Sequence, residues 1–216
     1  MASTTRRSSV AADRRAAAEA RTLDVVEELL RGGASFTELS VERIASEAGL
    51  SRSTFYLYFR DKTHLILRLA SSLKAETFET GEDWDPHGRV DGLDWLARAY
   101  LHIIRKYRGR SATLAAVLEV AGYDRAVREE LEANQRRFID RIAARLTEEQ
   151  RAGRTANDVV AATAARVMVW GAEQVIANQV IRSTAGDEAD ARLARELAAS
   201  QWYGVYRRPS LEGDQP

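Results

Sequence analysis

The sequence predicts an all-α protein of about nine helices, in a small N-terminal part followed by a larger one. Proline occurs only at positions 86, 209 and 216, so little interrupts helical backbone. Alanine and arginine, which favour helices, are abundant. Apolar residues recur three and four positions apart along almost the whole chain, which is the period of an amphipathic helix.

The composition excludes several classes of protein. The 216 residues include no cysteine, so disulfides, thiolate metal sites and cysteine nucleophiles are ruled out. Basic and acidic residues balance at 32 each, which gives no general sign of a polyanionic partner. The apolar runs are too short for a membrane span or a signal peptide, and we expect a cytoplasmic protein.

The first elements can be placed in order from the N-terminus. Residues 1–14 are basic and poor in apolar side chains, which indicates a flexible arm. A first helix is expected from about 15 to 31, ending at a glycine pair. Ser40 is a plausible N-cap for a second helix, which Gly49 ends.

A very short third helix follows Ser51, and a longer fourth one follows Asp61 as its cap. The stretch GLSRSTFYLYFRDK (49–62) places four aromatic rings within five positions. Phe55 and Phe59 lie four apart and share one helix face, so we expect both to be core.

A second face of this short helix carries Arg52 and Tyr56, also four residues apart, and a third carries Thr54 and Tyr58. Tyrosine hydroxyls need polar partners, which phosphates and bases supply. Lys62 stands in the first turn of the next helix, where the helix dipole disfavours a cation unless an anion such as a phosphate binds there. Two short helices joined by a glycine turn match the helix-turn-helix pattern, whose second helix enters the DNA major groove.

The stretch FTELSVERIASEAGLSRSTFYLYFRDKTHLI (36–66) resembles the DNA-binding segment of TetR-family transcriptional regulators, and SRSTFYLYF is similar to the branch typified by EthR. The resemblance implies that Arg52 reaches base edges and that Lys62 holds a phosphate. It further implies contacts to DNA backbone or bases from a set of hydroxyl-bearing side chains. These are Ser40, Ser51, Ser53, Thr54, Tyr56 and Tyr58.

We therefore expect a helix-turn-helix domain over 15–66 and a larger domain over 67–208, followed by a disordered tail over 209–216. The glycine-rich, acidic segment 80–92 is expected to be a loop. Beyond it, apolar stripes predict five helices. Their approximate ranges are 93–107, 111–121, 124–153, 155–183 and 188–206.

In the TetR family, such a larger region resembles a regulatory domain with a pocket between helices. Rings and amides at offset positions suggest a slot for a mostly apolar, neutral or weakly polar small molecule, although each could equally be ordinary core. The candidate ligand-binding residues are Trp95, His102, Asn134, Phe138, Trp170, Gln174 and Asn178.

The family resemblance also implies that the last two helices pair with a second subunit. A symmetric dimer suits DNA binding, because two copies double the contacts to a palindromic site. The final helix presents four candidate interface residues on one side. They are Leu193, Leu197, Trp202 and Val205.

An enzyme is the competing class. The sequence contains no G-x-S-x-G elbow, phosphate-binding glycine loop or H-E-x-x-H motif, and the three histidines have no ligand spacing. We expect no catalytic residue, metal or cofactor. The favoured function is a ligand-released repressor acting as a dimer on operator DNA. A transcriptional activator, a ligand-independent DNA-binding dimer and a small-molecule-binding protein are the alternatives.

Overall fold

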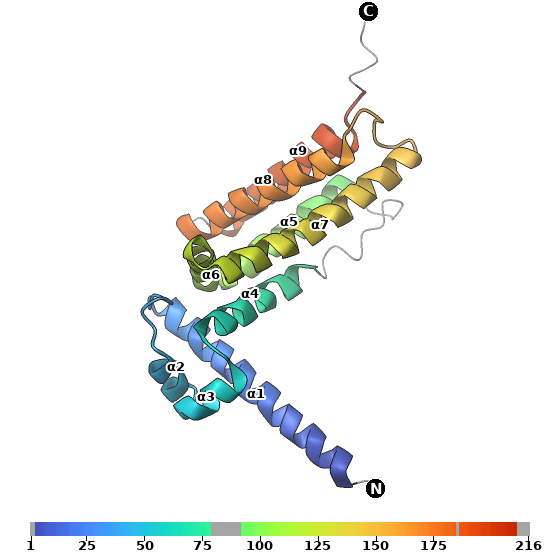
Figure 1. The fold of residues 1–216 in the computed structure, drawn as a ribbon. Coiled ribbons are helices and arrows are strands. Elements are labelled where there is room, and N and C mark those ends of the chain that lie inside the picture. Colours follow the sequence, from blue (N-terminus) through green and yellow to red (C-terminus); the bar gives the residue numbers. More distant parts are fainter. Residues whose placement is uncertain (1–2, 79–91, 185, 211–216) are drawn as a thin grey trace, which may run out of the picture. The chain divides into compact units, whose positions relative to one another are not determined.

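The computed structural model describes residues 3–78, 92–184 and 186–210, with side chains from residue 13 onward and not for 75–78. Within these ranges the chain forms nine α-helices and one π-helical turn, with no strand, which confirms the all-α prediction. The helices are α1 (Ser3–Arg31), α2 (Val41–Glu47), α3 (Arg52–Tyr58), α4 (Lys62–Phe78), α5 (Gly92–Gly109), α6 (Ser111–Tyr123), α7 (Arg125–Arg151), α8 (Ala161–Arg182) and α9 (Asp187–Gln201), and the turn is η2 (Trp202–Tyr206) (Figure 1).

The first helix is longer than predicted. It begins at Ser3 rather than near residue 15, so the backbone of most of the expected arm is helical. No glycine or proline stands between residues 3 and 31 to end the helix, and the run from 16 to 20 is rich in alanine. The expected loop 80–92 lies outside the described residues except for Gly92, and so does the tail beyond residue 210.

The chain divides into two compact units. The small unit comprises Met1–Leu73 and Ala112–Arg128, and the large unit comprises Lys74–Ser111 and Glu129–Pro216. The division therefore falls within α4, a few residues beyond the predicted boundary after residue 66.

Two aromatic rings anchor α3 in the small unit. Phe55 and Phe59 are both 0% exposed, and their ring centroids lie 5.3 Å apart. Ile44 and Ala45 of α2 are also buried, and α2 packs against α3. The two rings are core, as predicted, and they fix the rotation of α3 about its axis.

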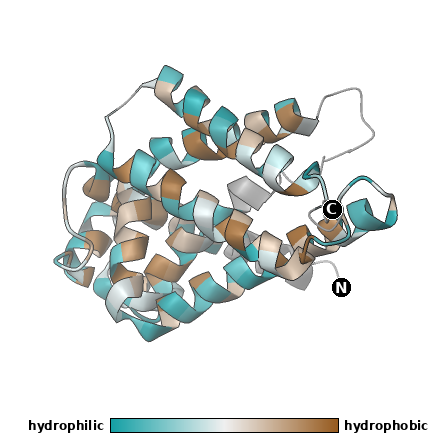
Figure 2. Cartoon of the chain, turned by 90° about the horizontal axis from the view of Figure 1, so that it is seen from above, coloured by the Kyte–Doolittle hydropathy of each residue, from teal (hydrophilic) through white to brown (hydrophobic). Residues whose placement is uncertain are grey.

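In the large unit α5 packs against both α8 and α9. Figure 2 shows hydrophobic and hydrophilic residues alternating along the helices, as expected when one face of each is covered. The start of α5 also lies against η2, because a Cβ atom at Gly92 would come within 2.2 Å of the Trp202 ring. Only glycine therefore lets the start of α5 approach η2 this closely. The buried core of this unit contains Leu96, Ile139, Leu146, Ala165, Met168, Val169, Ala198 and Tyr206.

An ion pair with a buried carboxylate connects three helices of the large unit. Arg108, near the end of α5, donates to both carboxylate oxygens of Asp190 at 2.5 and 2.6 Å, and to the carbonyl of Ser183 just after α8 at 3.0 Å. The Asp190 side chain is completely buried. The hydrogen bonds from Arg108 lower its pKa, so it stays ionised in the fold. This single guanidinium ties together the ends of α5, α8 and α9.

Candidate DNA-binding surface and ligand cavity

The face of α3 beside its buried rings carries Arg52 and Tyr56. Arg52 is exposed, and Tyr56 is 44% exposed despite its large ring. The Arg52 guanidinium lies 2.7 Å from the carboxylate of Glu42 on α2 and 5.9 Å from the centroid of the Tyr56 ring. A hydrogen bond with Tyr56 and the charge of Glu42 raise the pKa of Arg52. The guanidinium is therefore charged, solvent-accessible and oriented by two neighbours.

The exposed serines of this region also cap helices. Ser40 accepts a hydrogen bond from the backbone N–H of Arg43 at 3.1 Å, and Ser51 accepts one from that of Thr54 at 3.1 Å. Both N-caps are thereby confirmed. The Ser51 hydroxyl also lies 2.8 Å from the Ser53 hydroxyl and 2.7 Å from that of Thr54. This hydroxyl cluster lies at the N-terminal end of α3.

Lys62 begins α4, as predicted, and its ammonium group is held by the protein. The Nζ atom donates to the carbonyl oxygens of Phe36 at 2.7 Å and Thr37 at 3.0 Å, and it lies 4.9 Å from the centroid of the Phe36 ring. Burial lowers the pKa of Lys62. An ammonium group has three protons, so two carbonyl contacts still allow one bond to an anion.

Tyr58 of α3 is half-buried and contacts a side chain of α1. The guanidinium of Arg15 stands over its ring at 5.9 Å, and Arg15 also pairs with Glu19 at 2.8 Å. Glu19 in turn pairs with Arg68 of α4 at 3.2 Å. Through these contacts α1 and α4 support the C-terminal end of α3.

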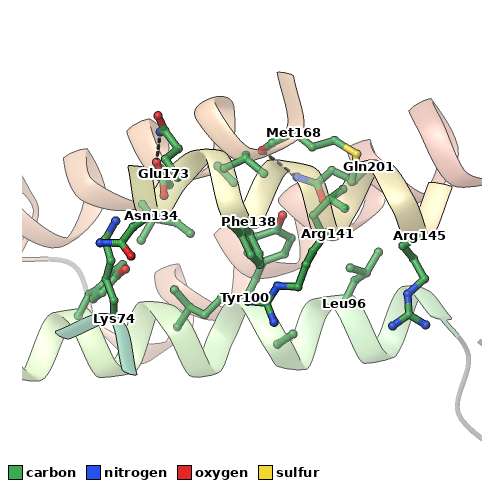
Figure 3. Close-up of a pocket in the computed structure, with 18 of the residues that line it drawn as sticks. Lys74, Leu96, Tyr100, Asn134, Phe138, Arg141, Arg145, Met168, Glu173 and Gln201 are labelled. Atoms are coloured by element: carbon green, nitrogen blue, oxygen red, sulfur yellow. Dashed lines mark hydrogen bonds between the residues drawn. The ribbon is translucent and has the colours of Figure 1, made fainter. Parts of the chain in front are cut away.

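A cavity of about 180 Å³ lies within the large unit (Figure 3). Its walls are formed by Lys74 of α4 and by residues of α5, α7, α8, α9 and η2. The described residues that line it are Lys74, Trp95, Leu96, Ala99, Tyr100, Ile103, Tyr107, Asn134, Gln135, Phe138, Arg141, Ile142, Arg145, Met168, Val169, Ala172, Glu173, Ile176, Gln201 and Tyr206.

Three of the seven predicted ligand-binding residues line this cavity, namely Trp95, Asn134 and Phe138. The amide of Asn134 is engaged within α7, because its Nδ2 donates to the carbonyl and the carboxylate of Glu130 at 2.9 and 3.0 Å. Its oxygen accepts from Arg137. Asn134 therefore forms part of the wall, with its own polar atoms already bonded.

The structure does not bring the other four predicted residues to the cavity. His102 lies on the exposed side of α5. Trp170, Gln174 and Asn178 are exposed on α8, with Trp170 50% exposed under the guanidinium of Arg166. The cavity side of α8 instead carries Met168, Ala172 and Ile176. The two rows are offset by two residues, or roughly 200° at 3.6 residues per turn, so they face opposite ways.

Residues 32–69 match the family model for bacterial regulatory proteins of the tetR family. This range includes α2 and α3 with all the residues predicted to contact DNA. The chain carries a TetR-type N-terminal domain. A search of curated proteins found no match for the chain.

Solved structures extend the likeness to the whole TetR-type fold. Salmonella enterica GusR has a TM-score of 0.72 at 19% identity, with 88% of this chain and 96% of GusR covered. NalD of Pseudomonas aeruginosa, the secondary repressor of the MexAB-OprM multidrug efflux pump, gives 0.68 at 18% identity, covering 89% and 98%. FadR from Bacillus subtilis in complex with stearoyl-CoA gives 0.67 at 17% identity, covering 83% and 95%. At these identities the likeness establishes the fold alone.

The four residues predicted at a dimer interface are half-buried within the single chain. Trp202 and Val205 pack against the core of the large unit, and the Arg207 guanidinium lies 4.2 Å from the Trp202 ring centroid. The large apolar side chains exposed in this unit lie mainly on α8, with Tyr203 in η2. Those of the α8 segment are Val160, Val167, Trp170, Val175 and Ile181.

Sequence reasoning missed several residues of both sites. Glu42 could have been found from its place in the first turn of α2. It follows two residues after Ser40, which is predicted to contact the DNA. Arg141 and Arg145 line the cavity, but arginines on a polar helix look like ordinary solvated charge. Tyr100 and Ile103 belong to the apolar stripe of the helix predicted over 93–107. Nothing in that stripe distinguishes a residue of the cavity wall from a residue of the core.

Two negative findings hold for the part of the chain that the structure describes. No group of three or more histidine and acidic side chains is placed to hold a metal ion. None of its helices combines the length and apolar character required to cross a bilayer.

Proposed function

We propose that the protein is a ligand-responsive, DNA-binding transcriptional regulator of the TetR family. The observation that carries this proposal is the exposed pair Arg52 and Tyr56 on α3, within the segment that matches the family model. A guanidinium can bind guanine O6 and N7 with two hydrogen bonds in the major groove. The stretch SRSTFYLYF further supports a place in the EthR-like branch. The regulator acts in the cytoplasm, as a repressor, without catalysis.

The protein acts as a homodimer on a palindromic operator. The exposed apolar residues on α8 support this, because Val167, Trp170 and Ile181 recur on one side at helical spacing. An exposed helix face with several large apolar side chains is typical of a protein interface. Gln174 and Asn178 lie on the same side, so we reassign them from the ligand site to this interface. Two-fold pairing places two α3 helices on successive major grooves.

A largely apolar small molecule in the cavity releases the operator. The B. subtilis FadR structure contains stearoyl-CoA, which supports an effector with an apolar portion for this fold. The helix α4 begins at Lys62 and reaches the cavity wall at Lys74. A ligand at the Lys74 end therefore contacts the same helix whose first residue, Lys62, is predicted to bind DNA. Release requires tighter ligand binding in the released conformation than in the DNA-bound one.

Selection of bound sites from random double-stranded DNA tests the proposal. We expect an enriched palindrome with half-sites about 10 base pairs apart, or a multiple of that spacing. A titration at physiological salt then compares the enriched site with a scrambled one. Equal affinity for the two sequences would disprove sequence-specific regulation by this protein. The same titration with Arg151→Ala, a change at an exposed arginine at the end of α7, serves as a control and should match the unmodified protein.

A further inference from the structure

The charged side chains of the cavity are unevenly distributed. Among the described residues that line it, Lys74, Arg141 and Arg145 carry positive charge and Glu173 carries negative charge. Figure 3 shows Lys74 and Asn134 toward one end, and Leu96 and Arg145 toward the other. Lys74 interacts electrostatically with Glu173. The lining therefore has an excess of two positive charges, and the two arginines lie away from the Lys74 end.

The two arginines share one face of α7. They are four residues apart, so their side chains are successive along the helix, roughly 6 Å apart in rise. Arg141 is exposed and Arg145 is half-buried, and the Arg141 guanidinium lies 5.8 Å from the ring centroid of Phe138. Both line the cavity while retaining contact with water. They therefore mark a cationic opening beside an aromatic wall.

The amides of the cavity are bonded to the protein. Gln135 donates to Glu173, and Gln201 donates to the carbonyl of Met168 at 3.3 Å. Asn134 is bonded within α7, as described above. Amides that are already satisfied offer a ligand little net hydrogen-bond energy. Guanidinium groups can each bind more than one acceptor, so Arg141 and Arg145 can bind an anionic group in addition to their contacts within the protein.

Apart from three tyrosines, the remaining wall is apolar. Phe138 and Ile142 from α7 face the cavity together with Ile103 from α5 and Met168 and Ile176 from α8. Such a wall favours an alkyl or aryl group, and the hydrophobic gain grows with the apolar area that the ligand buries. A neutral apolar ligand would fill this space without using the arginines.

We propose that the cavity binds an anionic amphiphile, with an apolar chain among these side chains and a carboxylate or phosphate on Arg141 and Arg145. This inference deepens the proposed function, on which its regulatory meaning rests, by naming the chemical class of the effector. It replaces the expectation of a neutral or weakly polar ligand. Guanidinium pairs bind carboxylate and phosphate oxygens with short charge-assisted hydrogen bonds.

Calorimetric titration of the full chain without DNA tests this inference. The probes are decanoate, decyl phosphate, 1-decanol and decyltrimethylammonium, with the ionic probes kept below their micelle concentrations and 1-decanol below its solubility limit. At least one anion should bind about tenfold to a hundredfold more tightly than 1-decanol, as expected for hydrogen bonds to charged groups. The cation should bind most weakly. Preference between the two anions identifies the head group as a carboxylate or a phosphate.

A double variant, Arg141→Gln with Arg145→Gln, should bind 1-decanol as the unmodified protein does and lose the preference for anions. Arg136→Gln is the matched control, because Arg136 is an exposed arginine of the same helix that does not line the cavity. If the double variant does not unfold cooperatively, each single change should still remove part of the preference.

Three results would overturn the inference: equal binding of 1-decanol and both anions, no saturable binding of either anion, or an anion preference that survives loss of both arginines. Because the assay contains no DNA, these results are independent of operator binding. Failure to select a DNA site would instead contradict the proposed function while leaving the ligand class standing.

Discussion

The helix α3 and the cavity of the large unit differ in how tightly their side chains are packed. On α3, Phe55 and Phe59 are fully buried, and Arg52 and Tyr56 project from the side they leave exposed. Around the cavity, Trp95, Tyr100 and Phe138 are only half-buried, because one side of each wall is not covered by protein. Base recognition needs a fixed geometry, whereas ligand binding needs space that the protein does not fill. Substitution of a buried ring on α3 should therefore reduce stability more than substitution of a ring at the cavity.

Replacing a buried ring on α3 should give the largest effect. Phe55→Ala should lower the free energy of unfolding by about 3 to 5 kcal/mol, since it removes a fully buried aromatic side chain and leaves a void. Phe138→Ala should cost clearly less, because that ring already borders empty volume. Urea denaturation of both variants checks the difference. Equal losses would mean that the cavity wall is packed as tightly as the core of α3.

The orientation of α3 could be predicted from sequence because the helix is short and has one apolar pair. Phe55 in its seven residues and Phe59 at its C-cap form a single i, i+4 pair of phenylalanines, and the polar residues on either side leave one choice for the buried face. The cap of Ser51 and the role of Asp61, which accepts from the backbone N–H of His64 at 2.6 Å, follow from residue type alone.

The orientation of α8 could not be predicted in the same way. Apolar side chains lie both on its buried face, as in Met168 and Ile176, and on its exposed face, as in Val167 and Trp170. The apolar pattern of α8 therefore does not identify its buried face. The row from Trp170 to Asn178 could equally face a cavity or a partner. Only the positions of α5 and α9 decide between them, and those are long-range contacts that no local pattern contains.

The buried ion pair at the end of the large unit should give the next largest effect. Asp190→Ala should destabilise the protein by about 3 kcal/mol, because it leaves the partly buried Arg108 without its carboxylate. The folded-state pKa of Asp190 is lowered, so its contribution is present above the usual carboxyl pKa and is lost as the pH falls through the lowered value.

Thermal unfolding between pH 7 and pH 3 measures this contribution. The unmodified protein should lose stability toward low pH more steeply than the variant lacking Asp190. Parallel curves would show that Asp190 contributes no pH dependence. Glu188→Ala is a suitable control, since Glu188 is an exposed acidic residue in the first turn of the same helix.

On the surface of α3, Arg52→Ala should change binding and leave stability nearly unaltered. Loss of a bidentate base contact costs about 1 to 3 kcal/mol per half-site and relaxes the preference at one operator position. The fold should tolerate it, because Arg52 is exposed and its pair with Glu42 is a surface ion pair. Titration of the selected operator, with one variant base pair at a time, measures both quantities. An unchanged affinity with unchanged preference would remove Arg52 from base recognition.

The smallest effect is expected at Ser51, where capping and DNA contact can be separated. Ser51→Ala removes the acceptor for the Thr54 N–H and should cost about 1 kcal/mol of stability. Ser51→Asp keeps a good N-cap and adds a negative charge, so it should retain the stability while weakening DNA binding through repulsion by the phosphates. Denaturation and operator titration of both variants distinguish the two roles. If Ser51→Asp bound the operator as tightly as the unmodified protein, Ser51 would lie away from the phosphate backbone and would serve only to begin α3.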